Sequence, residues 1–260
     1  MKNSFKAKKK YGQNFLINEG ICNQIVKLEN INSCNILEIG PGNMALSKKI
    51  IMEKPKKYFA VEIDKDLFKK HQENIISSYL LNEDALKINE FNLFNKQSFK
   101  IISNLPFNIS SKLLIKWIKV QNDYNCIESM TLMFQKELSD RIIAQHNSTK
   151  YGRITILVGA FFNVEKKIFV HQKNFNPMPN VDAEVLQFTP HKKNKIRKND
   201  FLKLEKITYD FFNERRKKNI KKIKKIFNEN QISKYGLDKY FNMRPENLDK
   251  ELYYKFSKIL

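Results

Sequence analysis

The chain has 260 residues, 42% of them hydrophobic, which is enough for one large domain or for a large domain with a small second one. Its 48 Lys and Arg against 27 Asp and Glu give a net charge of +21, which favours a polyanionic partner such as nucleic acid, or an anionic membrane surface. The three cysteines and four histidines lack disulfide or metal-ligand spacing, and no apolar run is long enough to span a membrane. We therefore expect a soluble cytoplasmic protein that acts as a monomer and holds no metal.

Strand-like and helix-like segments alternate over the first two thirds of the chain. Residues 1–10 carry five Lys and no acid, which predicts a mobile basic arm, and Asn18 is placed to cap a helix that runs to about Leu28. The segments expected next are a strand over 35–39, a helix over 44–52, a strand over 58–63, a helix from Asp66, strands over 79–81 and 101–103, a helix over 110–119, and strands over 130–134, 154–164 and 183–188. This alternation is typical of an α/β fold with a mostly parallel sheet.

A glycine-rich turn follows the first of these strands and opens a helix. Its sequence is Glu38-Ile39-Gly40-Pro41-Gly42, and glycines in such a turn let the backbone approach a ligand closely. Ala45 completes a G-x-G-x-x-A pattern, so a nicotinamide or flavin dinucleotide is one candidate ligand. The alternative is a tight turn with a structural role only.

Acidic residues stand where the next two strands end. Glu62 lies 22 residues after Gly40, where a carboxylate can accept hydrogen bonds from both ribose hydroxyls of an adenosine cofactor. Asp84 follows the strand over 79–81 and is placed to accept from an adenine amino group, although a helix cap would also explain it.

The sequence Asn104-Leu105-Pro106-Phe107 ends the strand before the helix over 110–119. Pro106 has no N–H and holds Leu105 towards extended geometry, so the neighbouring C=O groups remain free as acceptors. Asn104 adds an amide oxygen and Phe107 a flat ring, which together suit a planar base that carries an amino group. The alternative is a polar turn with Phe107 in the core.

Because ligands bind at the carboxyl ends of parallel strands, we expect Gly40, Glu62, Asp84 and Asn104 to form one site. This set of residues requires no phosphate on the ligand and places an amide and a ring beside the cofactor. It therefore favours S-adenosylmethionine over NAD.

The pattern changes after Pro190. Apolar residues fall at helical spacing in Phe201, Leu204, Ile207 and Phe211, and residues 191–260 carry 21 Lys and Arg against nine Asp and Glu. We expect a large domain over 1–190 and a small basic helical domain over 191–260. A basic cluster there predicts contact with RNA phosphates, although a solvated lysine-rich face is the plainer explanation; it consists of Arg215, Arg216, Lys217, Lys218, Lys221, Lys222, Lys224 and Lys225.

Several stretches together resemble the rRNA adenine N6,N6-dimethyltransferase family, specifically its small-subunit type. They occur in family order over residues 11–190 and are Tyr11–Leu16, Glu38–Gly42, Glu62–Asp64, Asp84–Ala85, Asn104–Ser110, Gln135–Glu137 with Arg141, Tyr151–Arg153 and Phe175–Asp182. The resemblance implies a Rossmann-like class I methyltransferase sheet with helices on both faces, and a small helical C-terminal domain that contacts RNA.

The resemblance also implies roles for individual residues. The cofactor S-adenosylmethionine would be bound by Asn14, Leu16, Gly40, Glu62, Asp84 and Asn104. The catalytic group would be Asn104, Leu105, Pro106 and Phe107, and the target adenine would stack between Phe107 and Phe175. Small-subunit members usually have Tyr where this chain has Phe107, so the ring remains and a hydroxyl is lost.

The implied reaction is dimethylation of two adjacent adenosines in a hairpin loop near the 3′ end of small-subunit rRNA, within an immature subunit. One alternative is a large-subunit adenine methyltransferase of the macrolide-resistance type, which shares these motifs. Another is a ribosome-assembly factor that acts mainly by binding, and a third is a dinucleotide oxidoreductase, for which no substrate acid–base pair is evident.

Overall fold

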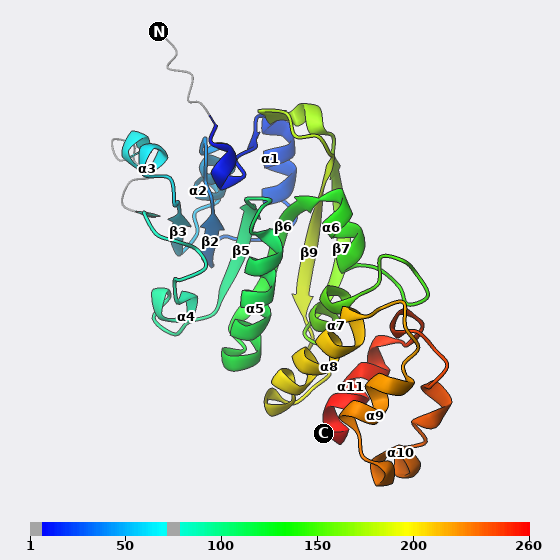
Figure 1. Ribbon diagram of the computed structural model, residues 1–260. Coiled ribbons are helices and arrows are strands. Elements are labelled where there is room, and N and C mark those ends of the chain that lie inside the picture. The colour runs from blue at the N-terminus through cyan, green and yellow to red at the C-terminus, as the bar shows by residue number, and fades with distance from the viewer. Residues whose placement is uncertain (1–6, 72–78) are drawn as a thin grey trace. The chain divides into compact units, whose positions relative to one another are not determined.

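The computed structural model describes residues 7–71 and 79–260, in two compact units (Figure 1). The first unit comprises Met1–Ser139 and Val164–Thr189, and the second comprises Asp140–Asn163 and Pro190–Leu260. Only residues 7–10 of the predicted basic arm are described, so the prediction for the remainder lies outside the described residues.

The first unit is built on a seven-stranded sheet. The strands are β2 (Asn35–Ile39), β3 (Lys57–Val61), β4 (Leu80–Leu81), β5 (Phe99–Asn104), β6 (Ile127–Gln135), β7 (Phe162–Val170) and β9 (Ala183–Pro190). The helices are α1 (Glu19–Val26), α2 (Ala45–Met52), α3 (Lys65–His71), α4 (Glu90–Leu93), α5 (Ser110–Tyr124) and α6 (Lys136–Ile142), with single turns η1 (Lys9–Tyr11) and η3 (Gln172–Asn174). A second, two-stranded sheet pairs β1 (Phe15–Leu16) with β8 (Phe175–Asn176).

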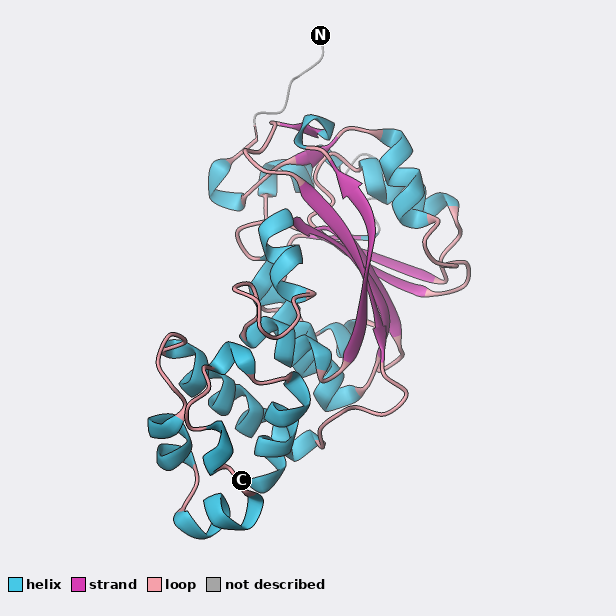
Figure 2. Ribbon diagram, turned by 90° about the vertical axis from the view of Figure 1, so that its right-hand side faces the viewer, coloured by secondary structure: helices cyan, strands magenta, loops and turns pink. Residues whose placement is uncertain are grey.

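The strand order of the large sheet is β4-β3-β2-β5-β6-β9-β7. Strands β4, β3, β2, β5 and β6 run parallel to one another, and β9 pairs with β6 in the antiparallel direction. Figure 2 shows helices on both faces of this twisted sheet. The predicted Rossmann-like α/β class with a mostly parallel sheet is confirmed.

Local sequence explains where the site-bearing elements begin and end. All five residues of β2 are buried, as expected for a central parallel strand covered on both faces. Asn18 caps α1 as predicted, since its Oδ1 accepts from the Ile21 N–H at 3.1 Å. Helix α5 runs five residues further than predicted and ends at Tyr124, and the residue that caps it, Asn125, adopts a left-handed conformation with φ 48°.

The second unit is helical. Its helices are α7 (Arg153–Gly159), α8 (Phe201–Asn213), α9 (Ile220–Ile226), α10 (Glu229–Tyr235) and α11 (Lys250–Ile259), with single turns η4 (Lys198–Asp200), η5 (Asp238–Tyr240) and η6 (Pro245–Asn247). Phe211 of α8 packs against Tyr253 and Phe256 of α11, so the helical spacing seen in the sequence marks the core of this unit. No helix within residues 7–71 and 79–260 is long and apolar enough to cross a membrane.

The predicted strand over 154–164 is wrong in its first half. Residues 153–159 form helix α7, and the strand β7 begins only at Phe162. Residues Ile154–Gly159 are all buried, so the run has no polar face. A short, fully apolar run has no periodicity by which a strand can be told from a buried helix.

The division of the chain also differs from the predicted boundary at 190. Residues from Pro190 onward do lie in the second unit, but Asp140–Asn163 lies there as well. Tertiary contacts place residues 140–163 in the second unit. The Tyr254 hydroxyl donates to the Ile156 carbonyl at 2.9 Å, and Gly159 leaves room for the same tyrosine. Composition along the chain carries no sign of such contacts.

Candidate active site

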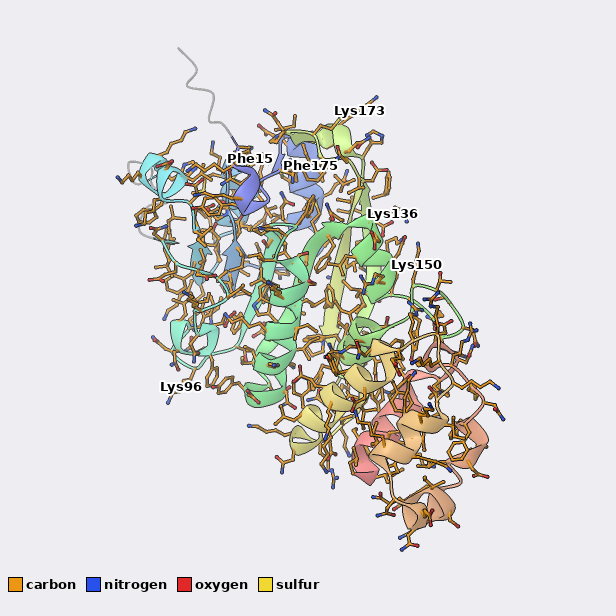
Figure 3. All side chains as sticks on the ribbon, viewed as in Figure 1. Phe15, Lys96, Lys136, Lys150, Lys173 and Phe175 are labelled. Carbon is orange, nitrogen blue, oxygen red and sulfur yellow. The ribbon has the colours of Figure 1, made fainter. Side chains whose placement is uncertain are left out.

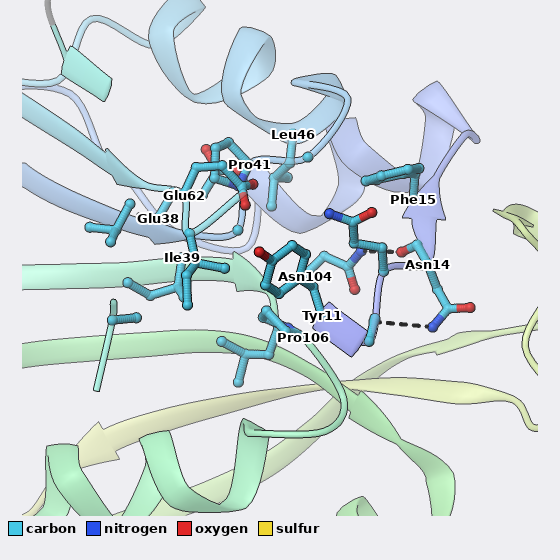
Figure 4. A pocket seen from close by; sticks show the side chains of 18 of the residues that line it. Tyr11, Asn14, Phe15, Glu38, Ile39, Pro41, Leu46, Glu62, Asn104 and Pro106 are labelled. Atoms are coloured by element: carbon cyan, nitrogen blue, oxygen red, sulfur yellow. Dashed lines mark hydrogen bonds between the residues drawn. The ribbon is translucent and has the colours of Figure 1, made fainter. Parts of the chain in front are cut away.

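A cleft opens at the carboxyl edge of the parallel strands (Figure 4). Eight of the predicted site residues line it, namely Asn14, Leu16, Gly40, Glu62, Asp84, Asn104, Leu105 and Pro106. They come from the N-terminal segment and from the ends of β2, β3, β4 and β5, as the strand-end argument predicts.

The glycine turn after β2 forms one wall. Gly40 and Gly42 have φ of +66° and +55°, conformations that favour glycine. A Cβ on Gly40 would lie 3.2 Å from the Pro106 ring, and one on Gly42 would lie 2.6 Å from the Phe15 ring. Glycine therefore allows two neighbouring segments to close against the turn.

All the charged side chains that line the cleft, among the described residues, are acidic. Glu38, Glu62, Glu83 and Asp84 border the cleft, whereas none of the described residues that line it is Lys, Arg or His. A dinucleotide pyrophosphate would lack a cationic partner here. A ligand that carries positive charge and an adenosine fits, so the site suits S-adenosylmethionine.

Glu62 is 4% exposed at the end of β3. Its Oε1 accepts from the Asp64 N–H at 2.8 Å, and the residue lines the cleft. Burial raises the pKa of Glu62, with backbone N–H donors acting in the opposite direction. The sequence argument correctly predicted that this residue lies in the cleft.

Asp84 both lines the cleft and shapes its own loop, since its Oδ1 accepts from the Leu86 N–H at 2.9 Å. Lys116 of α5 holds the same loop from behind. Its Nζ donates to the carbonyls of Ala85 and Ile88, both at 2.7 Å, and pairs with buried Glu90 at 2.9 Å. Sequence reasoning missed Lys116, because one lysine on a helix carries no signal of this role.

Asn104 has an unpartnered acceptor. Its Nδ2 donates to the Asn14 carbonyl at 3.1 Å, and because a carbonyl can only accept, this contact fixes which way the amide faces. Its Oδ1 is buried, and none of the described residues donates to it. A buried amide oxygen without a donor is uncommon and marks a position where a ligand N–H would bind.

Phe107 and Phe175 lie together but are not among the residues that line the cleft. Their ring centroids are 6.2 Å apart at an interplanar angle of 65°, so the rings meet edge to face. Phe175 is 3% exposed. A base can lie between these rings only after they separate.

The N-terminal segment is held over the cleft by charge. Lys8 Nζ contacts Asp64 at 2.6 Å and Asp66 at 2.5 Å, and Gln13 donates to Asp64 at 2.9 Å. The hydrogen bonds that Lys8 donates to the two aspartates raise its pKa. Burial would raise the pKa of Asp64, but the contacts with Lys8 and Gln13 outweigh it and the pKa is lowered.

Replacing Lys8 by Met is expected to weaken binding of S-adenosylhomocysteine severalfold at low salt, because the segment over residues 11–16 loses its ionic attachment. Calorimetry at two salt concentrations measures this, and the salt dependence of affinity should be smaller in the variant, since salt screens exposed pairs. Lys27→Met removes an exposed charge elsewhere and serves as the control. Equal affinities of all three proteins would contradict the prediction.

The predicted basic cluster is only partly exposed. Lys222 is 5% exposed and donates to the carbonyls of Glu214 and Lys217, so it braces the turn after α8. Burial lowers the pKa of Lys222. Arg215 pairs with Glu246 at 2.8 Å. The prediction of a phosphate contact is therefore wrong for Lys222, because its ammonium group faces the protein.

The exposed cations of the cluster are Arg216, Lys217, Lys218, Lys221, Lys224 and Lys225. Within residues 7–71 and 79–260, no three His, Cys, Asp or Glu side chains are grouped so as to hold a metal ion.

The parallel sheet, the glycine turn, the Glu62 carboxyl group in the cleft and the Asn104 oxygen without a donor among the described residues together fit a Rossmann-like methyltransferase. Comparison with known proteins agrees. Residues 4–260 match the family model described as ribosomal RNA adenine dimethylase, and the chain belongs to that family.

Individual relatives are similar along nearly the whole chain. The ribosomal RNA small subunit methyltransferase A of Pelagibacter ubique is 40% identical over 256 residues, which cover 97% of this chain and 96% of that protein. The crystal structure of a dimethyladenosine transferase from Plasmodium falciparum is 26% identical with a TM-score of 0.73, and the similarity covers 93% of this chain and 95% of that one. The 23S rRNA methyltransferase ErmE shares the fold at 18% identity and a TM-score of 0.71, over 95% of this chain and 99% of that one.

Proposed function

We propose that this protein uses S-adenosylmethionine to dimethylate the N6 atoms of two adjacent adenosines in a hairpin loop near the 3′ end of small-subunit rRNA, within an immature subunit. The observation that carries the proposal is the buried, unpartnered Oδ1 of Asn104 at the edge of an acidic cleft. Membership of the adenine dimethylase family and the small-subunit name of the Pelagibacter ubique relative support the choice of substrate.

The chain's own residues would orient the amino group. The Asn104 Oδ1 and the Leu105 carbonyl would each accept one N–H of the N6 amine, which draws the nitrogen lone pair out of conjugation with the ring and aims it at the cofactor. Asn14 keeps the Asn104 amide facing the right way through the 3.1 Å bond from Nδ2 to its carbonyl. Orientation of this kind lowers a barrier by up to about 7–11 kcal/mol in well-aligned systems.

S-adenosylmethionine, when bound, supplies an electrophilic methyl group on a positively charged sulfur. That methyl group would be taken up by the N6 lone pair, and the electron pair of the broken C–S bond would remain on sulfur. The nitrogen then releases one proton to water. Glu62 and Asp84 would hold the ribose and the adenine of the cofactor, and Leu16 and Gly40 would enclose it.

The substrate base has to leave its stack in the hairpin before it reaches Asn104, at a cost of a few kcal/mol. Stacking on Phe107 and Phe175 would offset about 1–3 kcal/mol for each contact. Because the two rings touch edge to face, the base would enter as they part.

Phe107→Ala is therefore expected to lower kcat/KM about 5- to 150-fold, which corresponds to the loss of one stacking contact. Phe107→Tyr keeps the ring and should retain nearly full activity. Single-turnover and steady-state methyl transfer to a hairpin RNA measure both. Equal losses in the two variants would show that stacking is not what Phe107 contributes.

The exposed cations after α8 are proposed to contact rRNA phosphates, consistent with the net charge of +21. Affinity for RNA should then fall steeply as salt rises. Replacing Arg216 and Lys221 together by Gln should reduce the slope of log affinity against log salt by about two, one for each phosphate contact. An unchanged slope would remove these two residues from the RNA surface.

The deciding experiment for the function is methyl transfer from labelled S-adenosylmethionine to immature small subunits and, separately, to large-subunit RNA, with the modified adenines mapped. Two adjacent dimethyladenosines near the 3′ end of small-subunit rRNA are expected. Label on large-subunit RNA alone would favour the macrolide-resistance type, and tight binding without label would favour an assembly factor.

A further inference from the structure

The small sheet of β1 and β8 joins two parts of the proposed site. Phe15 pairs with Asn176 and Leu16 pairs with Phe175, so one strand borders the cofactor cleft and the other carries a ring of the base site. Figure 3 shows Phe15 and Phe175 close together. The backbone N–H of Ile17 extends the pairing by donating to the Asn174 carbonyl at 2.9 Å.

Asn43 attaches this small sheet to the glycine turn. Its Nδ2 donates to the Leu16 carbonyl at 3.1 Å, while its Oδ1 accepts from the Ala45 N–H at 3.2 Å at the start of α2. The Phe15 ring lies against Gly42, where a Cβ would be 2.6 Å away. The position of Leu16 is thus set by the same turn that borders the cofactor cleft.

Phe175 completes the linkage. Its ring packs on Phe107 with centroids 6.2 Å apart; Phe175 belongs to the buried core cluster that includes Leu16, and Phe107 packs against that cluster. The contacts therefore run without interruption from the glycine turn through Asn43 and Leu16 to the two rings. Parting the rings for a base requires movement of the Phe175 ring, whose backbone is paired with Leu16.

We propose that Asn43 is a positioning residue that couples the base site to the cofactor cleft. This inference rests on the proposed function. A ligand in the cleft holds the glycine turn, the Asn43 bond holds Leu16 against that turn, and β1 then sets Phe175 in the arrangement that accepts the base. Coupling between binding sites is reciprocal, so cofactor occupancy raises RNA affinity and RNA raises cofactor affinity by the same factor.

The experiment uses the full-length protein and a hairpin RNA with 2-aminopurine in place of one target adenine. Affinity and 2-aminopurine fluorescence are measured with and without saturating S-adenosylhomocysteine, which cannot react. In the unaltered protein we expect the product to tighten RNA binding at least fivefold, within the usual range of coupling between sites. It should also change the fluorescence of the bound base.

Asn43→Ser tests the bond. A serine hydroxyl can still accept from the Ala45 N–H but is too short to replace the donor to Leu16. The ratio of RNA affinities with and without S-adenosylhomocysteine should fall to within twofold of one. Asn228→Ser makes the same change at the cap of α10, in the second unit, and should keep the full ratio.

A second variant guards against misfolding of the first. Asn18 Nδ2 donates to Asn174 Oδ1 at 2.8 Å, and Asn18→Asp removes that donor while its remaining oxygen still caps α1. Asn18→Asp should also lower the ratio of RNA affinities with and without S-adenosylhomocysteine. It replaces Asn43→Ser as the test if that variant does not fold.

A folded Asn43→Ser protein that keeps the full ratio, or an unaltered protein whose RNA affinity does not respond to S-adenosylhomocysteine, would overturn the inference. If Asn43→Ser does not fold, a full ratio in Asn18→Asp would overturn it. Methyl transfer by the same unaltered preparation keeps the two questions apart. If the protein transfers methyl groups but S-adenosylhomocysteine does not change its RNA affinity, only the role of Asn43 is refuted. If it transfers no methyl groups, the proposed function is refuted.

Discussion

Asn104→Ala is expected to lower kcat for methyl transfer about 10²–10³-fold, the loss typical of removing one preorganised polar partner of a reacting group. The Asn104 Oδ1 is buried without a donor among the described residues, and in the proposed function it accepts from the N6 amine. RNA affinity should change little, because Asn104 is not among the cations proposed to contact phosphates. Rapid-quench transfer of labelled methyl groups and filter binding of the hairpin measure the two quantities.

Asn104→Asp is the informative companion. An aspartate oxygen still accepts from the amine, but it cannot donate to the Asn14 carbonyl, which now faces Nδ2 at 3.1 Å. The variant should therefore be impaired, and cofactor binding should weaken as the N-terminal segment loosens. Full dimethylation by Asn104→Ala would remove the proposed role of this amide.

Glu38→Gln is expected to change how stability depends on pH. Glu38 is 2% exposed beneath the glycine turn, where burial raises its pKa from 4.5 to about 7, although hydrogen bonds from Tyr58 and Ser47 act in the opposite direction. A carboxyl group whose pKa is higher in the folded state than in the unfolded state makes its full contribution to stability at pH values below its unfolded-state pKa. It loses that contribution as the pH rises through its folded-state pKa. The shift from 4.5 to about 7 corresponds to about 3 kcal/mol.

The measurement is urea unfolding of both proteins at a series of pH values. The neutral amide does not titrate, so between pH 4.5 and just above pH 7 the free energy of unfolding of Glu38→Gln should rise by about 3 kcal/mol relative to that of the unaltered protein. Glu53→Gln, at an exposed position, should show no such relative change. Parallel pH profiles for Glu38→Gln and the unaltered protein would mean that Glu38 stays ionised in the fold.

Local rules were sufficient for much of the site. The turn at Gly40 and Gly42 needs left-handed backbone, and Glu62, Asp84 and Asn104 each follow a strand, so a parallel sheet brings them to one edge. The cap at Asn18 depends on a hydrogen bond to the backbone N–H three residues further along the chain. Features of this kind need only neighbours in sequence and the general geometry of the fold.

Contacts between distant segments escaped the sequence argument. Lys116 reaches the Asp84 loop across 31 and 28 residues, and the burial of Lys222 is visible only in the folded turn. Phe107 and Phe175 were expected to receive a base between them, yet in the fold they contact each other. None of these arrangements follows from spacing, because each depends on how side chains far apart in sequence pack.

The order of apolar runs, glycines and strand-end polar residues determined the α/β class and which strand-end residues line the cleft, because these depend on local geometry and on the common edge of parallel strands. Tertiary structure alone decided that residues 140–163 join the second unit and that Asn14 orients Asn104. It alone also decided that Asn43 ties Leu16 to the glycine turn. The physical reason is that a buried hydrogen bond needs a partner at one position and in one orientation, and only the folded chain supplies both.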